Sequence, residues 1–240
     1  MPSQHAYSFE VADWRRQVHS LYRDVRAARS PAEGYAIWVT GRTELFASHP
    51  ASPRSGNQRL VHADYDPAFR FMLPVSTVDV DDQADRFEVA TGTDGVVPFE
   101  RIGRFELPAI DSFEPAGLDI WWLASYGGGI FLPLRDGTAG SLTYGAGRYL
   151  LDTVKGADLG RADADPRGAD LAGADLAGAG LAGAGLAGAG DLTGAAWIVD
   201  LNFAYNPSCV YDSRWACPLA PAGNRISAPI PVGELLPKAG

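Results

Sequence analysis

The first fifty residues show the apolar spacing of two amphipathic helices. One stripe with a 3.6-residue period comprises Val11, Trp14, Val18, Leu21, Tyr22 and Val25. Ser30 is then followed by Pro31 and, three residues after the serine, by Glu33, which is typical of a capping box at a helix start. The pattern therefore predicts one helix through Val25 and a second from Ser30 to about Phe46.

Beyond residue 59 the pattern changes to short runs of aromatic and β-branched residues separated by turn residues, which predicts strands. The predicted strands are Phe69–Val80, Arg86–Thr91, Val96–Pro108, Leu118–Ser125, Gly129–Leu134, Gly147–Val154, Trp197–Ala204 and Ile226–Val232. Thr93–Gly95 and Arg135–Gly137 are interpreted as hairpin turns. We therefore expect a mainly β fold of the α+β class, with an antiparallel barrel-like or sandwich core and two N-terminal helices.

Residues 156–196 differ in composition from the rest, because alanine and glycine make up more than half of them. From Ala169 the motif Ala-Asp-Leu-Ala-Gly occurs twice and continues as Ala-Gly-Leu-Ala-Gly, with a period of five residues that resembles pentapeptide-repeat proteins. The repeats suffice for little more than one coil of a solenoid, so a weakly ordered low-complexity insertion is the favoured alternative. We expect one domain over residues 1–240 that carries this insertion.

Charge and composition exclude several classes of protein. The net charge of −9 and the pI of about 4.8 argue against non-specific nucleic-acid binding. No run of about 18 apolar residues is present, so no membrane-spanning helix is expected, and the first 20 residues lack a secretory signal pattern. These features favour a cytoplasmic protein with no membrane partner.

Two long motifs flank the insertion. The first is Gly127–Leu151; the second runs from Asp200 to Tyr211 and continues through Trp215–Pro221 to Asn224-Arg225. Together they resemble the bacterial and archaeal family called domain of unknown function 1684. The resemblance implies no established activity. Where the family pattern has an acidic residue before the Asn-Arg pair, this chain has Ala222-Gly223.

Polar residues of these motifs are the candidate site. They are Tyr144, Arg148, Asp200, Asn202, Tyr205, Asn206, Asn224 and Arg225. Arg148 can fork onto a carboxylate or phosphate, Asp200 can serve as a base, and Tyr144 with Asn202 can polarise a carbonyl. The alternative is a structural pair between Arg148 and Asp200 or Asp152. Because consecutive strands usually pair, we expect the strands flanking the insertion to be antiparallel neighbours that bring Arg148 to Asp200.

The cysteines and histidines do not indicate a metal centre. Seven residues lie between Cys209 and Cys217, which is wider than a zinc clip, and the chain has four histidines. A loop disulfide and two separate thiols both remain open. His62, two residues before Asp64, is either an oriented base or part of a solvated strand edge. No pattern for a nicotinamide, flavin, pyridoxal phosphate or haem cofactor is found, and we expect no cofactor.

Taken together, these features predict a small-molecule pocket in a β fold. The first hypothesis is a cofactor-independent acid–base enzyme acting on an acidic or carbonyl compound. The second is a non-catalytic ligand-binding or accessory module that uses either the same pocket or the tail Cys209–Arg225 to bind a partner. A third is a protein in which the polar motifs only brace the barrel.

Overall fold

The computed structural model describes residues 4–54, 56–78, 85–91, 95–162, 196–212, 215–216 and 218–238. Its N-terminal part is a pair of helices, α1 (Gln4–Arg26) and α2 (Pro31–Ser48), as predicted. Ser30 is the N-cap of α2, and its side chain accepts a hydrogen bond from the Glu33 backbone N–H. Among the described residues, neither helix is long and apolar enough to cross a membrane.

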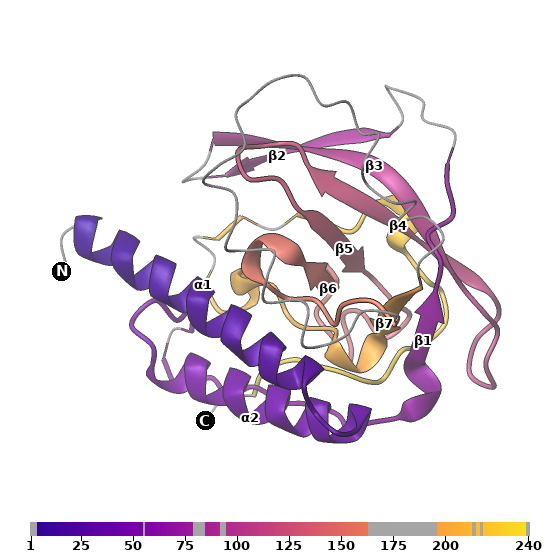
Figure 1. The fold of residues 1–240 in the computed structure, drawn as a ribbon, viewed down its shortest axis with the longest axis horizontal. Helices are drawn as coiled ribbons and strands as arrows, with labels where there is room; N and C mark the ends of the chain where they lie inside the picture. The colour runs from indigo at the N-terminus through magenta and orange to yellow at the C-terminus, as the bar shows by residue number, and fades with distance from the viewer. Residues whose placement is uncertain are drawn as a thin grey trace.

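The strands that follow the helices in the described chain form two antiparallel sheets (Figure 1). The larger sheet has the order β2-β3-β4-β5-β6 and curls into a half-barrel. Its strands are β2 (Arg86–Thr91), β3 (Gly95–Leu107), β4 (Ala116–Leu123), β5 (Ile130–Leu134) and β6 (Arg148–Asp152). The smaller sheet pairs β1 (Arg70–Leu73) with β7 (Trp197–Asp200). The expected fold class is confirmed.

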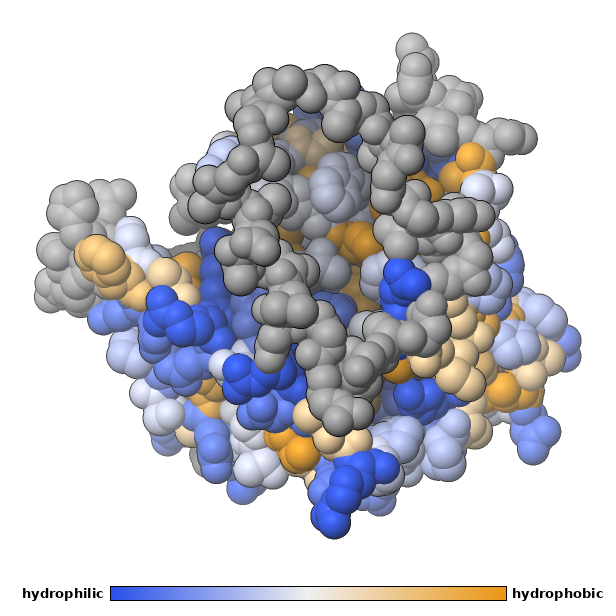
Figure 2. Space-filling view, in the orientation of Figure 1, coloured by the Kyte–Doolittle hydropathy of each residue, from blue (hydrophilic) through white to orange (hydrophobic). Residues whose placement is uncertain are grey.

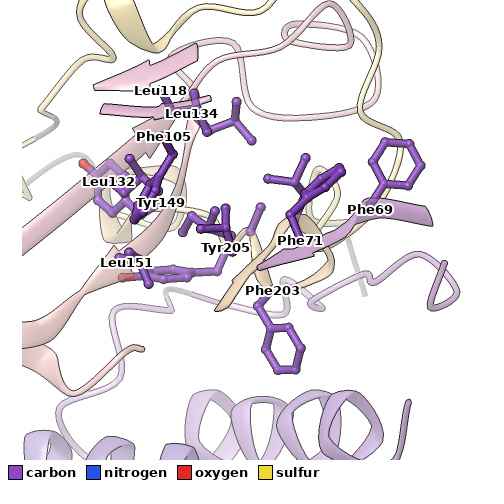
Figure 3. Close-up of a cluster of buried hydrophobic side chains, with 14 of the residues drawn as sticks. Phe69, Phe71, Phe105, Leu118, Leu132, Leu134, Tyr149, Leu151, Phe203 and Tyr205 are labelled. Atoms are coloured by element: carbon purple, nitrogen blue, oxygen red, sulfur yellow. The ribbon is translucent and has the colours of Figure 1, made fainter. Parts of the chain in front are cut away.

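Apolar side chains fill the space between the two sheets and the helices (Figure 3). The concave face of the large sheet carries an aromatic row in which neighbouring ring centroids lie 4.7–5.4 Å apart: Phe87, Phe99, Trp121, Phe131 and Tyr149. Phe203, which follows β7, packs against Tyr35 and Trp38 of α2. Trp38 in turn donates a hydrogen bond to the Tyr22 hydroxyl of α1. The helices are therefore anchored to the core by aromatic contacts.

Four sequence predictions are wrong in detail. Of the predicted strand Phe69–Val80, only Arg70–Leu73 forms a strand in the described residues. Ile226–Val232 is not a strand in the structure; it is an extended segment that hydrogen-bonds to the Arg135 carbonyl and the Asp136 carboxylate. Arg135–Gly137 is not a tight hairpin, because β5 and β6 are joined by residues 135–147 and Asp136 is buried. The strand predicted to reach Ala204 ends at Asp200, where the backbone turns into a short 3₁₀ helix, Leu201–Phe203.

The predicted insertion at 156–196 lies outside the described residues between 163 and 195. The flanks of this segment are adjacent, because the Ala162 N–H donates to the Ala196 carbonyl at 2.8 Å. Residues before it belong to the fold: Ala157 is buried, and the Asp158 carbonyl accepts a hydrogen bond from Arg26 of α1. On the face shown in Figure 2, hydrophilic side chains predominate over the two helices.

Candidate functional site

Asp200 lies at the end of β7, directly opposite Arg70 of β1. Its side chain is 1% exposed, although it is a carboxylate. Oδ1 is held firmly, because it accepts hydrogen bonds from the backbone N–H and the side-chain Nδ2 of Asn202 at 3.0 and 2.8 Å. Oδ2 is held loosely: the Tyr65 hydroxyl donates to it at 3.3 Å, and Arg70 Nε lies 3.6 Å away. One carboxylate oxygen is therefore fixed and the other is weakly engaged.

Asn202 fixes the position of this carboxylate. Its Oδ1 accepts from the Asp66 N–H at 2.9 Å, and its Nδ2 donates to the Asp66 carbonyl at 2.8 Å as well as to Asp200. The amide thereby clamps the turn that precedes β1 against the turn that follows β7. Asn202 is fully buried and its polar atoms are occupied within the protein, so it positions Asp200.

A cavity of about 160 Å³ opens beside Asp200, between the α1–α2 turn and the β1–β7 ribbon. Its charged lining residues are Arg26, Arg29, Arg70 and Asp200. Its large apolar lining residues are Val25, Leu159, Ile198 and Phe203. Ligand sites for drug-sized molecules usually measure about 300–1,000 Å³. This cavity therefore suits a compact compound.

Burial dominates the electrostatics of Asp200. Desolvation raises the pKa of this carboxyl, and hydrogen bonds from Asn202 together with the charge of Arg70 offset part of the rise. Burial and the negative charge of Asp200 also raise the pKa of Tyr65 to about 12, so its hydroxyl stays protonated and donates a hydrogen bond. The carboxyl at the cavity wall therefore holds its proton more tightly than usual, and its Oδ2 is contacted by a neutral phenol.

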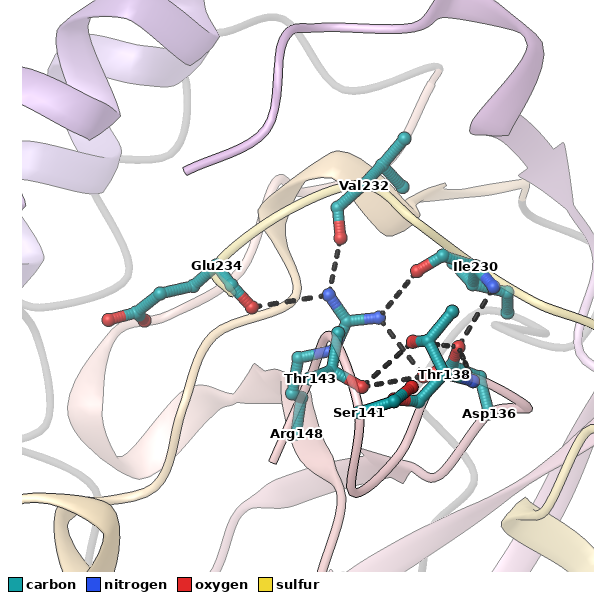
Figure 4. A network of polar contacts seen from close by, with 8 residues as sticks. All are labelled: Asp136, Thr138, Ser141, Thr143, Arg148, Ile230, Val232 and Glu234. Atoms are coloured by element: carbon teal, nitrogen blue, oxygen red, sulfur yellow. Dashed lines mark hydrogen bonds and ion pairs between the residues drawn. The ribbon is translucent and has the colours of Figure 1, made fainter. Parts of the chain in front are cut away.

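Arg148 pairs with Asp136 and not with Asp200, contrary to expectation; Figure 4 shows its guanidinium against Asp136 and the C-terminal segment. Its fully buried guanidinium pairs with Asp136 at 3.2 Å and donates to the carbonyls of Ile230, Val232 and Glu234. The strands flanking the insertion lie in different sheets, because β6 pairs with β5 whereas β7 pairs with β1. The two motifs meet beyond the end of β7, where Tyr205 forms an antiparallel bridge with Tyr149 of β6. Arg148 therefore ties the C-terminal segment to the β5–β6 connection.

Tyr205 and Asn206 belong to a second buried network. Glu234 accepts hydrogen bonds from the Asn206 N–H, the Tyr211 hydroxyl and Arg42 of α2. The Arg42 guanidinium lies 4.8 Å from the Tyr205 ring centroid and 4.4 Å from that of Phe46. The negative charge of Glu234 is thus neutralised inside the protein, and this network joins α2 to the C-terminal segment.

The remaining candidates lie apart from Asp200. Asn224 is fully buried; it accepts from Trp121 Nε1 and donates to the carbonyls of Asp119 and Pro133, so it joins the C-terminal segment to the large sheet. Arg225 is exposed and donates to the Ala220 carbonyl. Tyr144 is half-buried, with its hydroxyl 3.9 Å from the Cys209 sulfur. Cys217 lies outside the described residues.

Of the eight candidates, Asp200 and Asn202 meet in one cluster. Sequence reasoning missed Tyr65, which donates to Asp200, and the three arginines that line the cavity with that aspartate, Arg26, Arg29 and Arg70. Strand alternation does place Arg70 on the face opposite Phe71 and Leu73, but this local pattern carries no information on the partner strand. Within the described ranges, no three histidine, cysteine, aspartate or glutamate side chains lie close enough to hold a metal ion.

Most of the chain matches a known protein family. Residues 57–165 and 186–235 match the profile of a family described as "Protein of unknown function (DUF1684)", which is more than half of the chain. The chain belongs to this family. The matched residues of the DUF1684 region include Tyr65, Arg70 and Asp200, whereas Arg26 and Arg29 precede them. The cavity is therefore built jointly by the family region and the helical segment before it.

A solved structure supports the fold assignment. The solution NMR structure of an uncharacterized protein from Haloarcula marismortui shares 22% sequence identity with this chain, with a TM-score of 0.51. The likeness covers 82% of this chain and 89% of that one. No curated protein matches the sequence. At this identity the likeness concerns the fold alone.

Proposed function

We propose that the chain binds a compact anionic compound, a small carboxylic acid or an acidic carbonyl compound, in the cavity beside Asp200. The observation that carries this proposal is the loosely held Asp200 Oδ2, buried at the cavity wall with Arg70 3.6 Å away. A buried carboxylate normally has closer partners for both oxygens. A ligand in the cavity would supply the missing partner.

Each residue has a distinct role in this proposal. Arg70 presents a planar guanidinium that forks onto a ligand carboxylate. Tyr65 donates its hydroxyl proton to the same Asp200 oxygen and so positions that oxygen at the cavity wall. Asp200, whose pKa is raised by burial, gives a proton to the ligand or takes one from it.

A non-catalytic binding module is the alternative. Asp200 is the one aspartate, glutamate, histidine or cysteine among the described residues that line the cavity. A single proton-transfer group suffices for binding a protonated acid or for a one-proton exchange. The two functions therefore differ in turnover and not in where the ligand binds.

The binding step is tested by following backbone NMR resonances during titration with acetate, pyruvate and inorganic phosphate. Acetate or pyruvate is expected to shift resonances of β1, β7 and the α1–α2 turn. Arg70→Gln should weaken this binding at least tenfold, and Asp200→Asn should change its pH dependence. Arg86→Gln is the matched control, because Arg86 is an exposed strand arginine outside the cavity lining. Shifts that are absent, or equal in Arg70→Gln and wild type, would refute the proposal.

Turnover is tested with pyruvate in deuterated water. If Asp200 removes a proton from the carbon next to the carbonyl, the methyl protons exchange with deuterium, and proton NMR detects their loss. Wild type should accelerate this exchange and Asp200→Asn should not, while Arg86→Gln behaves as wild type. Binding without accelerated exchange would favour the non-catalytic module.

A further inference from the structure

The side chains along one face of the β1–β7 ribbon change from charged to apolar. Residues directly opposite each other in an antiparallel pair point to the same face. Arg70 faces Asp200, and two residues further along, on the same face, Met72 faces Ile198. The two pairs are separated by roughly 6.8 Å along the strand. The ribbon therefore presents a charged pair and an apolar pair side by side.

The apolar half is continuous from the cavity to the surface. Val25, Leu159, Ile198 and Phe203 line the interior. Met72, the cross-strand neighbour of Ile198, is 62% exposed, whereas the alternate residues Phe71 and Leu73 are buried in the core. An exposed methionine beside a half-buried isoleucine extends this wall outward as a flexible apolar rim.

We infer that the ligand is a short-chain aliphatic monocarboxylic acid, with its carboxylate at Arg70 and its hydrocarbon tail along Ile198 towards Met72. This inference rests on the proposed function, that a small anion binds beside Asp200. A compact polar anion such as phosphate would use the charged pair but leave the apolar wall uncovered. A hydrocarbon tail covers that wall and releases its water.

The charge of Asp200 is compatible with such a ligand. Two carboxylates at one site cannot both ionise without repulsion, and one of them retains a proton. Asp200 is the group whose surroundings favour the protonated form. The protonated Asp200 then donates a hydrogen bond to the ligand carboxylate, while Arg70 balances its charge.

A chain-length series tests the inference. Dissociation constants are measured by calorimetry for acetate, butyrate and hexanoate, with succinate as a polar acid of the same length as butyrate. Each methylene that contacts the wall should tighten binding about fourfold, the factor that corresponds to about 0.8 kcal/mol per buried CH₂. Succinate should bind more weakly than butyrate because its second carboxylate would face the apolar wall.

Two variants locate the tail. Met72→Gln should reduce the gain from butyrate to hexanoate and leave acetate binding unchanged. Val96→Gln is its control, because Val96 is a strand residue of similar exposure, 59%, in the other sheet. Arg70→Gln should weaken all members of the series, which separates binding in the cavity from adsorption of hydrocarbon elsewhere.

The outcomes distinguish this inference from the proposed function. Equal affinities for acetate and hexanoate, or tighter binding of succinate than of butyrate, would overturn the aliphatic ligand and leave anion binding intact. A Met72→Gln series identical to that of Val96→Gln would overturn the placement of the tail. Failure of every acid in the series to bind would overturn the proposed function itself.

Discussion

Two buried aspartates that each face an arginine show how the surroundings of a residue decide its role. Asp136 Oδ2 accepts hydrogen bonds from the Thr138 N–H, the Thr138 hydroxyl and the Ile230 N–H. Its Oδ1 accepts a hydrogen bond from the Arg148 guanidinium. Among the described residues, the interactions of Asp200 Oδ2 are a long hydrogen bond and an ion-pair contact of 3.6 Å. The first carboxylate is saturated by the protein. The second retains capacity for a ligand.

Replacing Asp136 with asparagine should therefore destabilise the fold strongly. Whichever way the amide is oriented, its NH₂ group faces either Arg148 or the donors at Oδ2. We expect a loss of about 3–5 kcal/mol in the free energy of unfolding, as for a broken buried ion pair. Urea unfolding measures this loss of stability. Asp24→Asn, at an exposed pair with Arg23, should change stability by about 1 kcal/mol or less. A loss from Asp136→Asn as small as this would contradict the structural role.

Asp200 should make stability depend on pH in the opposite sense to an ordinary salt-bridged carboxylate. Its folded-state pKa lies above the unfolded value, so between the two the folded chain binds more protons. The contribution is present at low pH and is lost as pH rises through the folded pKa. We expect the free energy of unfolding of wild type relative to Asp200→Asn to fall as pH increases from about 4. A difference that grows with pH would mean that Arg70 and Asn202 outweigh burial.

At the scale of an element, the connection between β5 and β6 depends on backbone freedom at particular glycines. Gly147, directly before β6, has φ of +102°, and a Cβ there would lie 2.7 Å from the Leu134 carbonyl oxygen. Gly145 has no such constraint, because the nearest atom to an added Cβ is 3.7 Å away. The close approach at Gly147 places Arg148 against the carbonyls of the C-terminal segment.

Gly147→Ala should therefore destabilise the protein, whereas Gly145→Ala should not. Positive φ and the clash with a backbone atom that cannot move aside together cost about 1–3 kcal/mol. The control substitution, two residues away in the same connection, should stay within about 0.5 kcal/mol of wild type. Thermal and urea unfolding of the two variants decide the matter. Equal effects would mean that the connection adapts to a side chain at Gly147.

At the scale of the whole molecule, the cavity exists because distant segments meet. Helix α1 and the α1–α2 turn form one side, and the β1–β7 ribbon forms the other. The segment at 156–162 contributes Leu159 and returns to the ribbon, where the Gly160 carbonyl accepts from the Ile198 N–H. The repeat at 163–195 begins and ends next to this ribbon, at Ala162 and Ala196.

Removing residues 163–195 should leave the fold intact. Ala162 and Ala196 are already hydrogen-bonded, so an Asn-Gly turn can join them without moving the ribbon. We expect the melting temperature to change by only a few degrees and acid binding beside Asp200 to persist. A melting temperature more than about 8 °C lower, which corresponds to roughly 2 kcal/mol or more at this size, would show that the repeat contributes to the fold. Extending the deletion to Ala157, which is buried, should be destabilising.

Local features were predictable from the sequence. The helices, the Ser30 cap and most strands follow from side-chain spacing, because these signals act within a few residues along the chain. The antiparallel hairpin of β2 and β3 was predictable for the same reason, and it pairs Thr91 with Gly95. The two long motifs also identified the family, and Asp200 with Asn202 already formed a sequence-local pair.

Only the tertiary structure decided which distant residues meet. β7 pairs with β1, from which it is separated by the whole large sheet in sequence, and this pairing brings Arg70 to Asp200. Arg148 forms its ion pair with Asp136, which lies in the β5–β6 connection that the sequence predicted to be a simple turn. Strand alternation states which face a side chain occupies but not which strand lies beside it. Pairing is determined by burial of the combined apolar faces, a property of the assembled core that no single segment carries.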